Sequence, residues 1–464
     1  MTLIKSISGI RGTIGGQVGE NLTPIDAVKF AAAYGAWIKQ QRDKKDYKVV
    51  VGRDARISGK MIQDLVMNTL VGVGIHVVDI GLSTTPTVEV AVPMEHADGG
   101  IILTASHNPK QWNALKLLNS DGEFLDGVEG AKILDIAESG TIDFADVDSL
   151  GKITKNKAYI DLHIIEVLDL PLVTVNPIEE ARFKVVVDGV NSTGGWAIPL
   201  LLERLGVEVV KLYCEPNGHF PHNPEPLKEH LSELSKRVVE ERADFGIVVD
   251  PDVDRLAFVD ENGEMFGEEY TLVACADYVL SKTPGNTVSN MSSTRALRDV
   301  TEKYGGTYEA SAVGEVNVVK LMKQNKVVIG GEGNGGIIYP EAHYGRDALV
   351  GVALFLSLLA EKDMKVSELR KTYPDYYMSK KKIELTPSLD VDAILKAIEE
   401  RYQNEQLTTI DGVKIDFPEN WVHLRKSNTE PIVRIYTEAK SQTLADDLAD
   451  KFIEEIGSIA GINV

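Results

Sequence analysis

Three segments of the chain repeat one pattern of hydrophobic and polar positions. In each, an apolar run predicts a buried strand, a polar turn follows, apolar residues at helical spacing predict a helix, and a second apolar strand ends the segment. The helices are expected over residues 60–73, 196–205 and 295–304. This order is that of a βαβ unit, so we expect an α/β protein with three related domains, each a mixed, largely parallel sheet covered by helices.

The C-terminal region follows a different pattern. Strands and helices alternate there without the βαβ spacing, with helices expected around 391–402 and 443–456, which favours an α+β domain. The length of 464 residues agrees with several domains, because about 100–200 residues per domain is usual. Around a central cleft we therefore expect four domains, with boundaries good to several residues: 1–153, 154–257, 258–373 and 374–464.

Composition and charge narrow the classes of partner. Lys and Arg total 49 against 70 Asp and Glu, and the net charge of −21 argues against nucleic acid or an anionic membrane. The longest apolar run, 348–360, is too short to span a bilayer and predicts a buried helix. The N-terminus lacks the apolar segment of a signal peptide, and the two distant cysteines, Cys214 and Cys275, suit a reducing cytoplasm. Monomer and homodimer both remain open.

Polar residues gather at four places where a predicted strand ends, which is where ligands bind in α/β proteins. The first is residues 104–109, in which Ser106 follows an apolar strand and could act as a nucleophile. An ordinary Asn-Pro turn is the alternative. His107 is adjacent, but in an extended segment it would face the opposite way, so no base role is assigned to it.

The second place is an acidic segment between two predicted strands. Asp250, Asp252 and Asp254 alternate, so in an extended loop all three carboxylates would point to one side and could bind a hard cation. An EF-hand loop would need glycine where Arg255 stands, and helices on both sides. A three-carboxylate Mg²⁺ loop is therefore preferred, with a solvated acidic turn as the alternative.

The third place is a glycine-rich loop. Residues 330–336 hold five glycines around Glu332 and Asn334, whose side chains can accept hydrogen bonds from sugar hydroxyls while the glycines let backbone approach closely. A dinucleotide-binding loop is not expected, because the GxGxxG spacing is absent and no helix-forming segment follows. A simple glycine-rich turn is the alternative.

The fourth place lies between two predicted strands of the last domain. Its residues offer guanidinium, hydroxyl, amide and backbone N–H donors that could cradle a phosphate: Arg425, Ser427, Asn428 and Thr429. A turn with a surface arginine is the alternative. Further positive charge, or further structural ion pairs, would come from Arg11, Arg53 and Arg56.

The motifs TASHNP, DPDVDR, GEGNG and RKSNTEP, in this order, resemble those of the α-D-phosphohexomutase family, and the resemblance covers the whole chain. It implies an isomerase that interconverts hexose 6-phosphate and hexose 1-phosphate through a phosphorylated serine, Mg²⁺ and a sugar 1,6-bisphosphate. Phosphoglucosamine mutase is the preferred activity, and phosphomannomutase or phosphoglucomutase is the alternative. More distant alternatives are a sugar phosphatase and a non-catalytic sugar-phosphate or Ca²⁺-binding protein.

The resemblance also implies a role for each site residue. The implied metal ligands are Ser106, Asp250, Asp252 and Asp254. The implied catalytic residues, among which Lys116 would assist proton transfer, are Ser106, Lys116, Arg255 and Arg11. The implied substrate-binding residues are Glu332, Asn334, Arg425, Ser427, Asn428 and Thr429. Many relatives carry Ser and His where this chain has Asn334 and Gly336, so no histidine role is expected in that loop.

Overall fold

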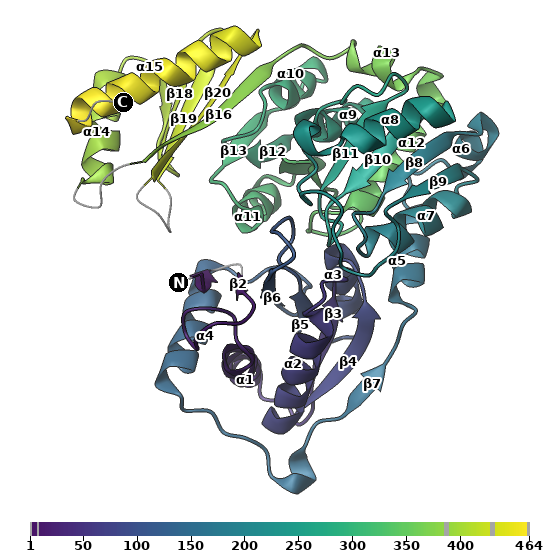
Figure 1. Cartoon of the computed structure of the whole chain (residues 1–464), viewed down its shortest axis with the longest axis vertical. Helices are drawn as coiled ribbons and strands as arrows, with labels where there is room; N and C mark the ends of the chain where they lie inside the picture. Colours follow the sequence, from purple (N-terminus) through teal and green to yellow (C-terminus); the bar gives the residue numbers. More distant parts are fainter. Residues whose placement is uncertain (1, 7–8, 385–388, 427–431, 462–464) are drawn as a thin grey trace.

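The computed structural model describes residues 2–6, 9–384, 389–426 and 432–461. In this part of the chain four β-sheets, each with its own helices, follow one another from the N-terminus to the C-terminus (Figure 1). The predicted α/β architecture with a distinct last domain is confirmed. Among the described helices, none combines the length and apolarity needed to cross a membrane.

The first domain contains a seven-stranded mixed sheet in the order β1-β2-β6-β5-β3-β4-β7. Its strands are β1 (Ile4–Ser6), β2 (Gly9–Thr13), β3 (Tyr47–Arg53), β4 (Ile75–Leu82), β5 (Gly99–Leu103), β6 (Trp112–Leu118) and β7 (Ile153–Lys155). Its helices are α1 (Pro24–Gln41), α2 (Gly59–Val73), α3 (Thr85–Met94) and α4 (Gly127–Ser139).

The second and third domains each contain a four-stranded sheet, in the orders β11-β10-β8-β9 and β13-β12-β14-β15. The second domain has strands β8 (Lys184–Asp188), β9 (Glu208–Leu212), β10 (Phe245–Val249) and β11 (Leu256–Asp260), and helices α5 (Tyr159–Leu168), α6 (Val175–Ala181), α7 (Gly194–Arg204) and α8 (Ser232–Glu241). The third has strands β12 (Thr287–Asn290), β13 (Tyr308–Ser311), β14 (Ile329–Glu332) and β15 (Gly336–Ile338), and helices α9 (Glu268–Lys282), α10 (Ala296–Lys303), α11 (Glu315–Asn325), α12 (Ala348–Lys362) and α13 (Val366–Arg370).

The three domains share one topology. In each, the first strand pairs in parallel with the second and the third, and the fourth runs antiparallel to the third. The corresponding sets are β3-β4-β5-β6, β8-β9-β10-β11 and β12-β13-β14-β15. The repeated pattern of the sequence therefore corresponds to a repeated fold. The expected boundaries at 153 and 257 fall inside β7 and β11, and the domain limits remain predictions.

The C-terminal domain is built differently, as the pattern predicts. Its five strands are all antiparallel, in the order β16-β20-β19-β18-β17, and α15 lies along one face of the sheet (Figure 1). The strands are β16 (Tyr377–Glu384), β17 (Gln406–Thr408), β18 (Val413–Asp416), β19 (Trp421–Lys426) and β20 (Ile432–Ala439), and the helices are α14 (Val391–Arg401) and α15 (Gln442–Ala460).

The hydrophobic cores show which domains are joined most firmly. One cluster of buried side chains runs through the second and third domains and includes most residues of the apolar helix α12, which confirms the predicted buried helix. Phe355 of α12 stacks on Phe258 of β11 with ring centroids 3.8 Å apart. The first and last domains have separate clusters of their own. Hydrophobic burial therefore joins the two middle domains. The first domain also has apolar contact with the second, because Tyr159 of α5 belongs to a buried cluster with residues of the first sheet and of α3.

Candidate active site

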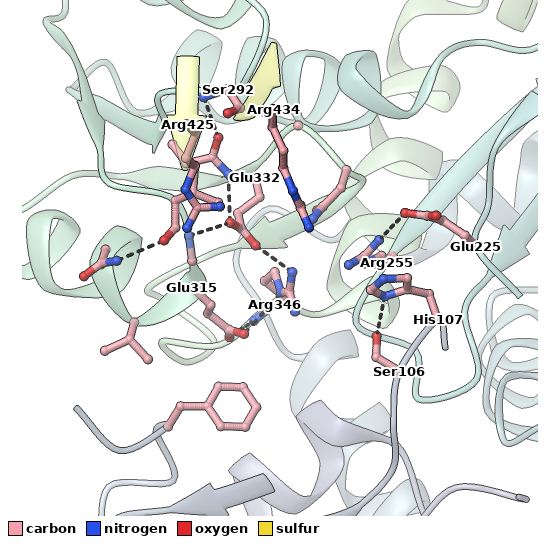
Figure 2. Close-up of a pocket in the computed structure, with 18 of the residues that line it drawn as sticks. Ser106, His107, Glu225, Arg255, Ser292, Glu315, Glu332, Arg346, Arg425 and Arg434 are labelled. Atoms are coloured by element: carbon pink, nitrogen blue, oxygen red, sulfur yellow. Dashed lines mark hydrogen bonds and ion pairs between the residues drawn. The ribbon is translucent and has the colours of Figure 1, made fainter. Parts of the chain in front are cut away.

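Three of the four predicted polar sites occupy the same place in the repeated fold. Ser106 lies in the loop between β5 and β6, the aspartates lie between β10 and β11, and Glu332 ends β14 before the turn into β15. Each position follows the third strand of its domain and precedes the antiparallel fourth. These loops line one cleft of about 1040 Å³, to which all four domains contribute (Figure 2). The expected central cleft is therefore present.

The backbone at Ser106 is held in a left-handed conformation, with φ at +49°. Such a conformation is uncommon for residues other than glycine and needs support from its surroundings. The buried Arg56 supplies it by donating hydrogen bonds to the carbonyl oxygens of Ser106 and Asn108. Asp54 holds the Arg56 guanidinium at 3.0 Å. Arg56 is therefore a structural ion pair beneath the serine loop, one of the two roles considered for it.

The serine hydroxyl and the three aspartates meet, although they come from different domains. Ser106 Oγ donates to Asp250 Oδ2 at 2.7 Å. Carboxylate oxygens of Asp250, Asp252 and Asp254 lie within 4.8 Å of one another, and all three residues are buried. The segment is a turn and not the extended loop that was expected, since Val253 has φ +64°. The expectation that these carboxylates share one side of an extended loop was therefore wrong. The turn nevertheless brings the three carboxylates together.

The aspartate group fits a hard cation. Asp252 Oδ1 and Asp254 Oδ1 are buried and find no hydrogen-bond partner among the described residues. Burial, and after it the charges of Asp254 and Asp252, raises the pKa of Asp250 well above its ordinary value. Three carboxylates this close repel one another unless a cation or a proton offsets their charge. Oxygen ligands in this number are those that Mg²⁺ and Ca²⁺ prefer.

Two basic side chains also contact the aspartates. Lys116 Nζ lies 2.7 Å from Asp252 Oδ2 and 3.4 Å from Asp254 Oδ2. Although burial favours the neutral amine, the charges of Asp252 and Asp254 hold the pKa of Lys116 above its ordinary value. Arg346 Nη2 donates to Asp254 Oδ2 at 2.7 Å, and its Nη1 donates to Glu332 Oε2 at 2.6 Å. Arg346 thus ties the metal loop to the glycine-rich loop.

The structure corrects the prediction for His107. Its Nδ1 lies 3.4 Å from Ser106 Oγ, so the two side chains face the same region and do not point in opposite directions (Figure 2). The reason is the positive φ of Ser106, which breaks the alternation of an extended segment. Burial and the nearby Arg255 lower the pKa of His107 to about 2, so the ring is neutral at pH 7.

Guanidinium groups from three domains gather in the cleft between the serine loop and the C-terminal domain. Burial, then the charges of Arg434 and Arg255, lowers the pKa of Arg11. In Figure 2, Arg434 extends from the C-terminal domain toward Arg255, which pairs with Glu225 at 3.0 Å. Three arginines that repel one another in a shared cleft form a site for an anion with several oxygens. Arg11 and Arg255 were expected here, whereas Arg434 was not.

The far end of the cleft is formed by β19 and β20. Arg425 and Arg434 are directly opposite each other in the antiparallel register, so their side chains share one face of the sheet. Like charges in such a pair are destabilising. Asp411 partly compensates by accepting from Arg425 Nε at 2.9 Å. The predicted phosphate-binding residues Ser427, Asn428 and Thr429 lie outside the described residues.

The glycine-rich loop places its two polar residues in the cleft. Glu332 accepts hydrogen bonds from Asn290 Nδ2 at 2.8 Å and from Arg346, while the buried Asn334 Oδ1 finds no partner within the described residues. Glu315, at the start of α11, lies against Arg346 with 3.2 Å between Oε2 and Nε. Burial raises the pKa of Glu315 to about 7, although Arg346 opposes the shift.

Sequence reasoning missed many of the residues that line the cleft, among them Arg346, Glu315 and Arg434. Arg346 follows a loop without a recognisable motif. Glu315 begins α11 in a segment that likewise lacks a recognisable motif. Arg434 carried a usable signal, since it follows the predicted phosphate loop on a strand and the register of a hairpin places it opposite Arg425.

Models of four consecutive protein-domain families match the chain. They are described as the phosphoglucomutase/phosphomannomutase α/β/α domains I, II and III and the C-terminal domain, and they match residues 3–142, 158–263, 267–377 and 381–455. The matches follow the order of the four sheets.

Individual relatives agree over nearly the whole chain. A phosphoglucomutase/phosphomannomutase of Thermococcus kodakarensis is 36% identical over 96% of this chain and 98% of its own length, and a probable phosphoglucosamine mutase of Methanopyrus kandleri is 33% identical over 96% of both. A crystal structure of a phosphoglucomutase/phosphomannomutase family protein from Burkholderia thailandensis superposes with a TM-score of 0.85 at 25% identity, covering 100% of this chain and 99% of that one. The chain therefore belongs to the phosphoglucomutase/phosphomannomutase family and is a phosphohexomutase, an enzyme of intramolecular phosphotransfer.

Proposed function

We propose that the protein interconverts hexose 6-phosphate and hexose 1-phosphate through a phosphate carried on Ser106, with glucosamine phosphate as the preferred substrate. The observation that supports this most directly is the 2.7 Å contact between Ser106 Oγ and Asp250 Oδ2 in a cleft that also collects guanidinium groups. A nucleophile, a cation site and anion-binding groups then lie at one cleft.

The residues around Ser106 suit phosphoryl transfer. The transferring group passes through a loose transition state with charge on three oxygens, so the protein mainly supplies position and positive charge. Asp250, Asp252 and Asp254 would hold Mg²⁺, which when bound supplies positive charge to the phosphoryl oxygens. Arg255 and Lys116 provide further positive charge from the protein itself.

Lys116 would also assist proton transfer at the sugar hydroxyl. In the described arrangement its pKa lies above the ordinary value because Asp252 and Asp254 contact it. The same carboxylates would share their charge with a bound cation, which lowers the pKa of Lys116 toward the range useful for catalysis. Neutral His107 lies 3.4 Å from Ser106 Oγ, but with its pKa lowered to about 2 it is too weak a base to take this proton.

The opposite end of the cleft suits the phosphate that does not react. Phosphoserine 106 would donate to the free hydroxyl of the bound monophosphate, and the 1,6-bisphosphate would then turn around before returning its other phosphate to Ser106. Arg425 and Arg434, with Ser427, Asn428 and Thr429, would hold whichever phosphate lies away from the serine. Glu332 and Asn334 would bind the sugar hydroxyls between the two ends.

The preference for glucosamine phosphate rests on the acidic lining near the sugar loop. Glu315 lines the cleft beside Glu332; its Oε1 accepts from the backbone N–H of Arg346 at 3.0 Å, and its Oε2 lies 3.2 Å from Arg346 Nε. A carboxylate there complements the ammonium group of glucosamine but has no charged partner on glucose or mannose. Substrates that leave a buried polar group unpaired are discriminated against most strongly.

A comparison of substrates tests the proposal. Glucosamine, glucose and mannose 6-phosphates are assayed side by side with Mg²⁺ and a bisphosphate primer, in the wild type and in Glu315→Gln. We expect the highest kcat/KM for glucosamine 6-phosphate, and a loss of about 10-fold or more of that preference in Glu315→Gln, since charged hydrogen bonds contribute about 1.5–3 kcal/mol. Equal loss for all three sugars would remove Glu315 from amine recognition.

A further inference from the structure

A second cluster of metal-binding residue types lies outside the cleft, where the first three domains meet. His163 belongs to α5, His343 follows β15, and Asp347 precedes α12. The Nε2 atoms of His163 and His343 lie 2.9 Å and 3.1 Å from the same oxygen, Oδ2 of Asp347. One ligand atom from each residue falls within 4.8 Å of the others. His163 and Asp347 are each 1% exposed.

Other polar groups face the remaining atoms of these residues. His163 Nδ1 is 2.9 Å from Thr87 Oγ1 of α3, and His343 Nδ1 is 3.5 Å from Glu89 Oε2 of the same helix. Asp347 Oδ1 accepts from the backbone N–H of Leu349 at 2.8 Å at the start of α12. Metal-binding histidines are oriented in this way, with the outer ring nitrogen on a hydroxyl or a carboxylate and the inner one free for the ion.

Glu89 provides an independent sign that a cation belongs here. Glu89 is 2% exposed, and neither of its carboxylate oxygens finds a hydrogen-bond partner within the described residues. Gly345 makes room for it, because a Cβ at that position would lie 1.9 Å from Glu89 Oε2. A buried carboxylate without a partner is costly. Coordination of His343 through Nε2 would leave its proton on Nδ1, directed at Glu89, and so give the carboxylate a donor.

We propose that His163, His343 and Asp347 form a site for Zn²⁺, separate from the aspartate site of the cleft. Two imidazole nitrogens and one carboxylate oxygen are ligands that suit zinc, whereas Mg²⁺ prefers oxygen alone. Each ring stays neutral on binding, since its proton moves from Nε2 to Nδ1. The side chain of His343 keeps 15% of its surface exposed, which leaves one side open for a solvent ligand.

The Zn²⁺ site would stabilise the arrangement of residues in the active-site cleft. It joins α3 of the first domain, α5 of the second and the start of α12 in the third, and α5 packs against both α3 and α12. Asp347 is the neighbour in sequence of Arg346, which contacts Asp254 and Glu332 in the cleft. Holding Asp347 therefore helps to fix the arginine that connects the metal loop to the sugar loop.

Cobalt spectroscopy on the full chain tests this site without relying on catalysis. The protein is stripped of metal with a chelator, saturated with Mg²⁺ to fill oxygen-only sites, and titrated with Co²⁺. We expect one Co²⁺ per chain with the visible absorption bands of a nitrogen-containing site, and loss of these bands on addition of Zn²⁺. X-ray absorption of the zinc form should show imidazole ligands.

Variants locate the site. His343→Gln should weaken Co²⁺ binding by at least about 100-fold, and Glu89→Gln by about 10- to 100-fold, as expected for a ligand and for its outer partner. His76→Gln, on the surface of the first domain, and Asp250→Asn, in the cleft, should keep the bands. If the wild type shows no such bands, or if His343→Gln keeps them, the proposal is wrong. The wild-type measurements remain decisive even if His343→Gln fails to fold.

Discussion

The two ends of the cleft are held in different ways. At the reactive end, groups from three domains meet directly: Ser106 with Asp250, Lys116 with Asp252, and Arg346 with Asp254. At the far end, Arg425 and Arg434 lie on neighbouring strands of one sheet, and the bond that holds Arg425 comes from Asp411 of the same domain. The first arrangement depends on domain packing, whereas the second would survive a movement of the whole last domain.

This difference suits the two tasks of the cleft, which are phosphoryl transfer at Ser106 and reorientation of the bisphosphate. Transfer to and from Ser106 needs atoms fixed to fractions of an ångström, and buried ion pairs between domains provide that. The bisphosphate must turn around between the two transfers, which needs room. A phosphate site on a domain with its own hydrophobic core can approach and withdraw without disturbing the serine and the aspartates. The following predictions test whether the two ends are independent in this sense.

The largest expected effect is at Arg346. Replacing it with methionine leaves Asp254, Glu332 and Glu315 buried without their shared cation, so we expect the free energy of unfolding to fall by about 3–5 kcal/mol and turnover to be lost. Urea denaturation and the standard mutase assay measure both. Arg204→Met removes a half-exposed pair with Asp161 and should cost about 1 kcal/mol or less. An equal loss of unfolding free energy in both variants would contradict the role of Arg346 in connecting the two loops.

An intermediate effect is expected at Arg425. Arg425→Ala removes a charged contact to phosphate worth about 1.5–3 kcal/mol, so KM should rise about 10- to 100-fold while kcat changes less. Steady-state kinetics with the preferred substrate give both constants. Arg401→Ala, on α14 of the same domain, serves as the matched control and should leave KM unchanged. A KM for Arg425→Ala that equals the wild-type value would remove this residue from the phosphate site.

An effect on stability alone is expected at the contact between the third and last domains. Burial raises the pKa of Glu269 to about 8, even though Lys380 Nζ of β16 lies 3.8 Å from its carboxylate and opposes the shift. The folded state then binds the extra proton between about pH 4.5 and 8, so stability falls as pH rises through that window, by at most about 1.4 kcal/mol per pH unit.

Urea midpoints between pH 5 and pH 8 measure this slope. Glu269→Gln should flatten it, because the amide does not titrate, whereas Glu264→Gln on the surface should not. Identical slopes in the wild type and Glu269→Gln would show that Glu269 does not titrate in this window, and that the contact with the last domain is independent of pH.

Much of the fold could be predicted because its signals are local. The repeated strand, turn and helix of the first three domains follow from apolar spacing alone, and so does the buried helix α12. The motifs also placed Ser106, the three aspartates and Glu332 at strand ends, where the structure has them. The reason is that a polar run after an apolar strand marks the end of that strand at the edge of the sheet.

The remaining features depend on contacts between distant residues. The conformations of Ser106 and Val253 are set by surrounding groups such as Arg56, so alternation along the chain predicted the wrong direction for His107. Arg346 acquires its role only when its domain packs against the metal loop. Asp347 and His163 are separated by 184 positions and meet only in the folded protein. Spacing in a sequence contains no information on such pairs.

The central claim is that Ser106 carries the phosphate between turnovers, and mass spectrometry of the peptide containing Ser106 tests it directly. After incubation with a hexose 1,6-bisphosphate and Mg²⁺ we expect one phosphate on Ser106, its loss when excess hexose monophosphate is added, and neither phosphate nor turnover in Ser106→Ala. Turnover by a Ser106→Ala protein, or a phosphate that appears on another residue and exchanges with substrate, would contradict the account.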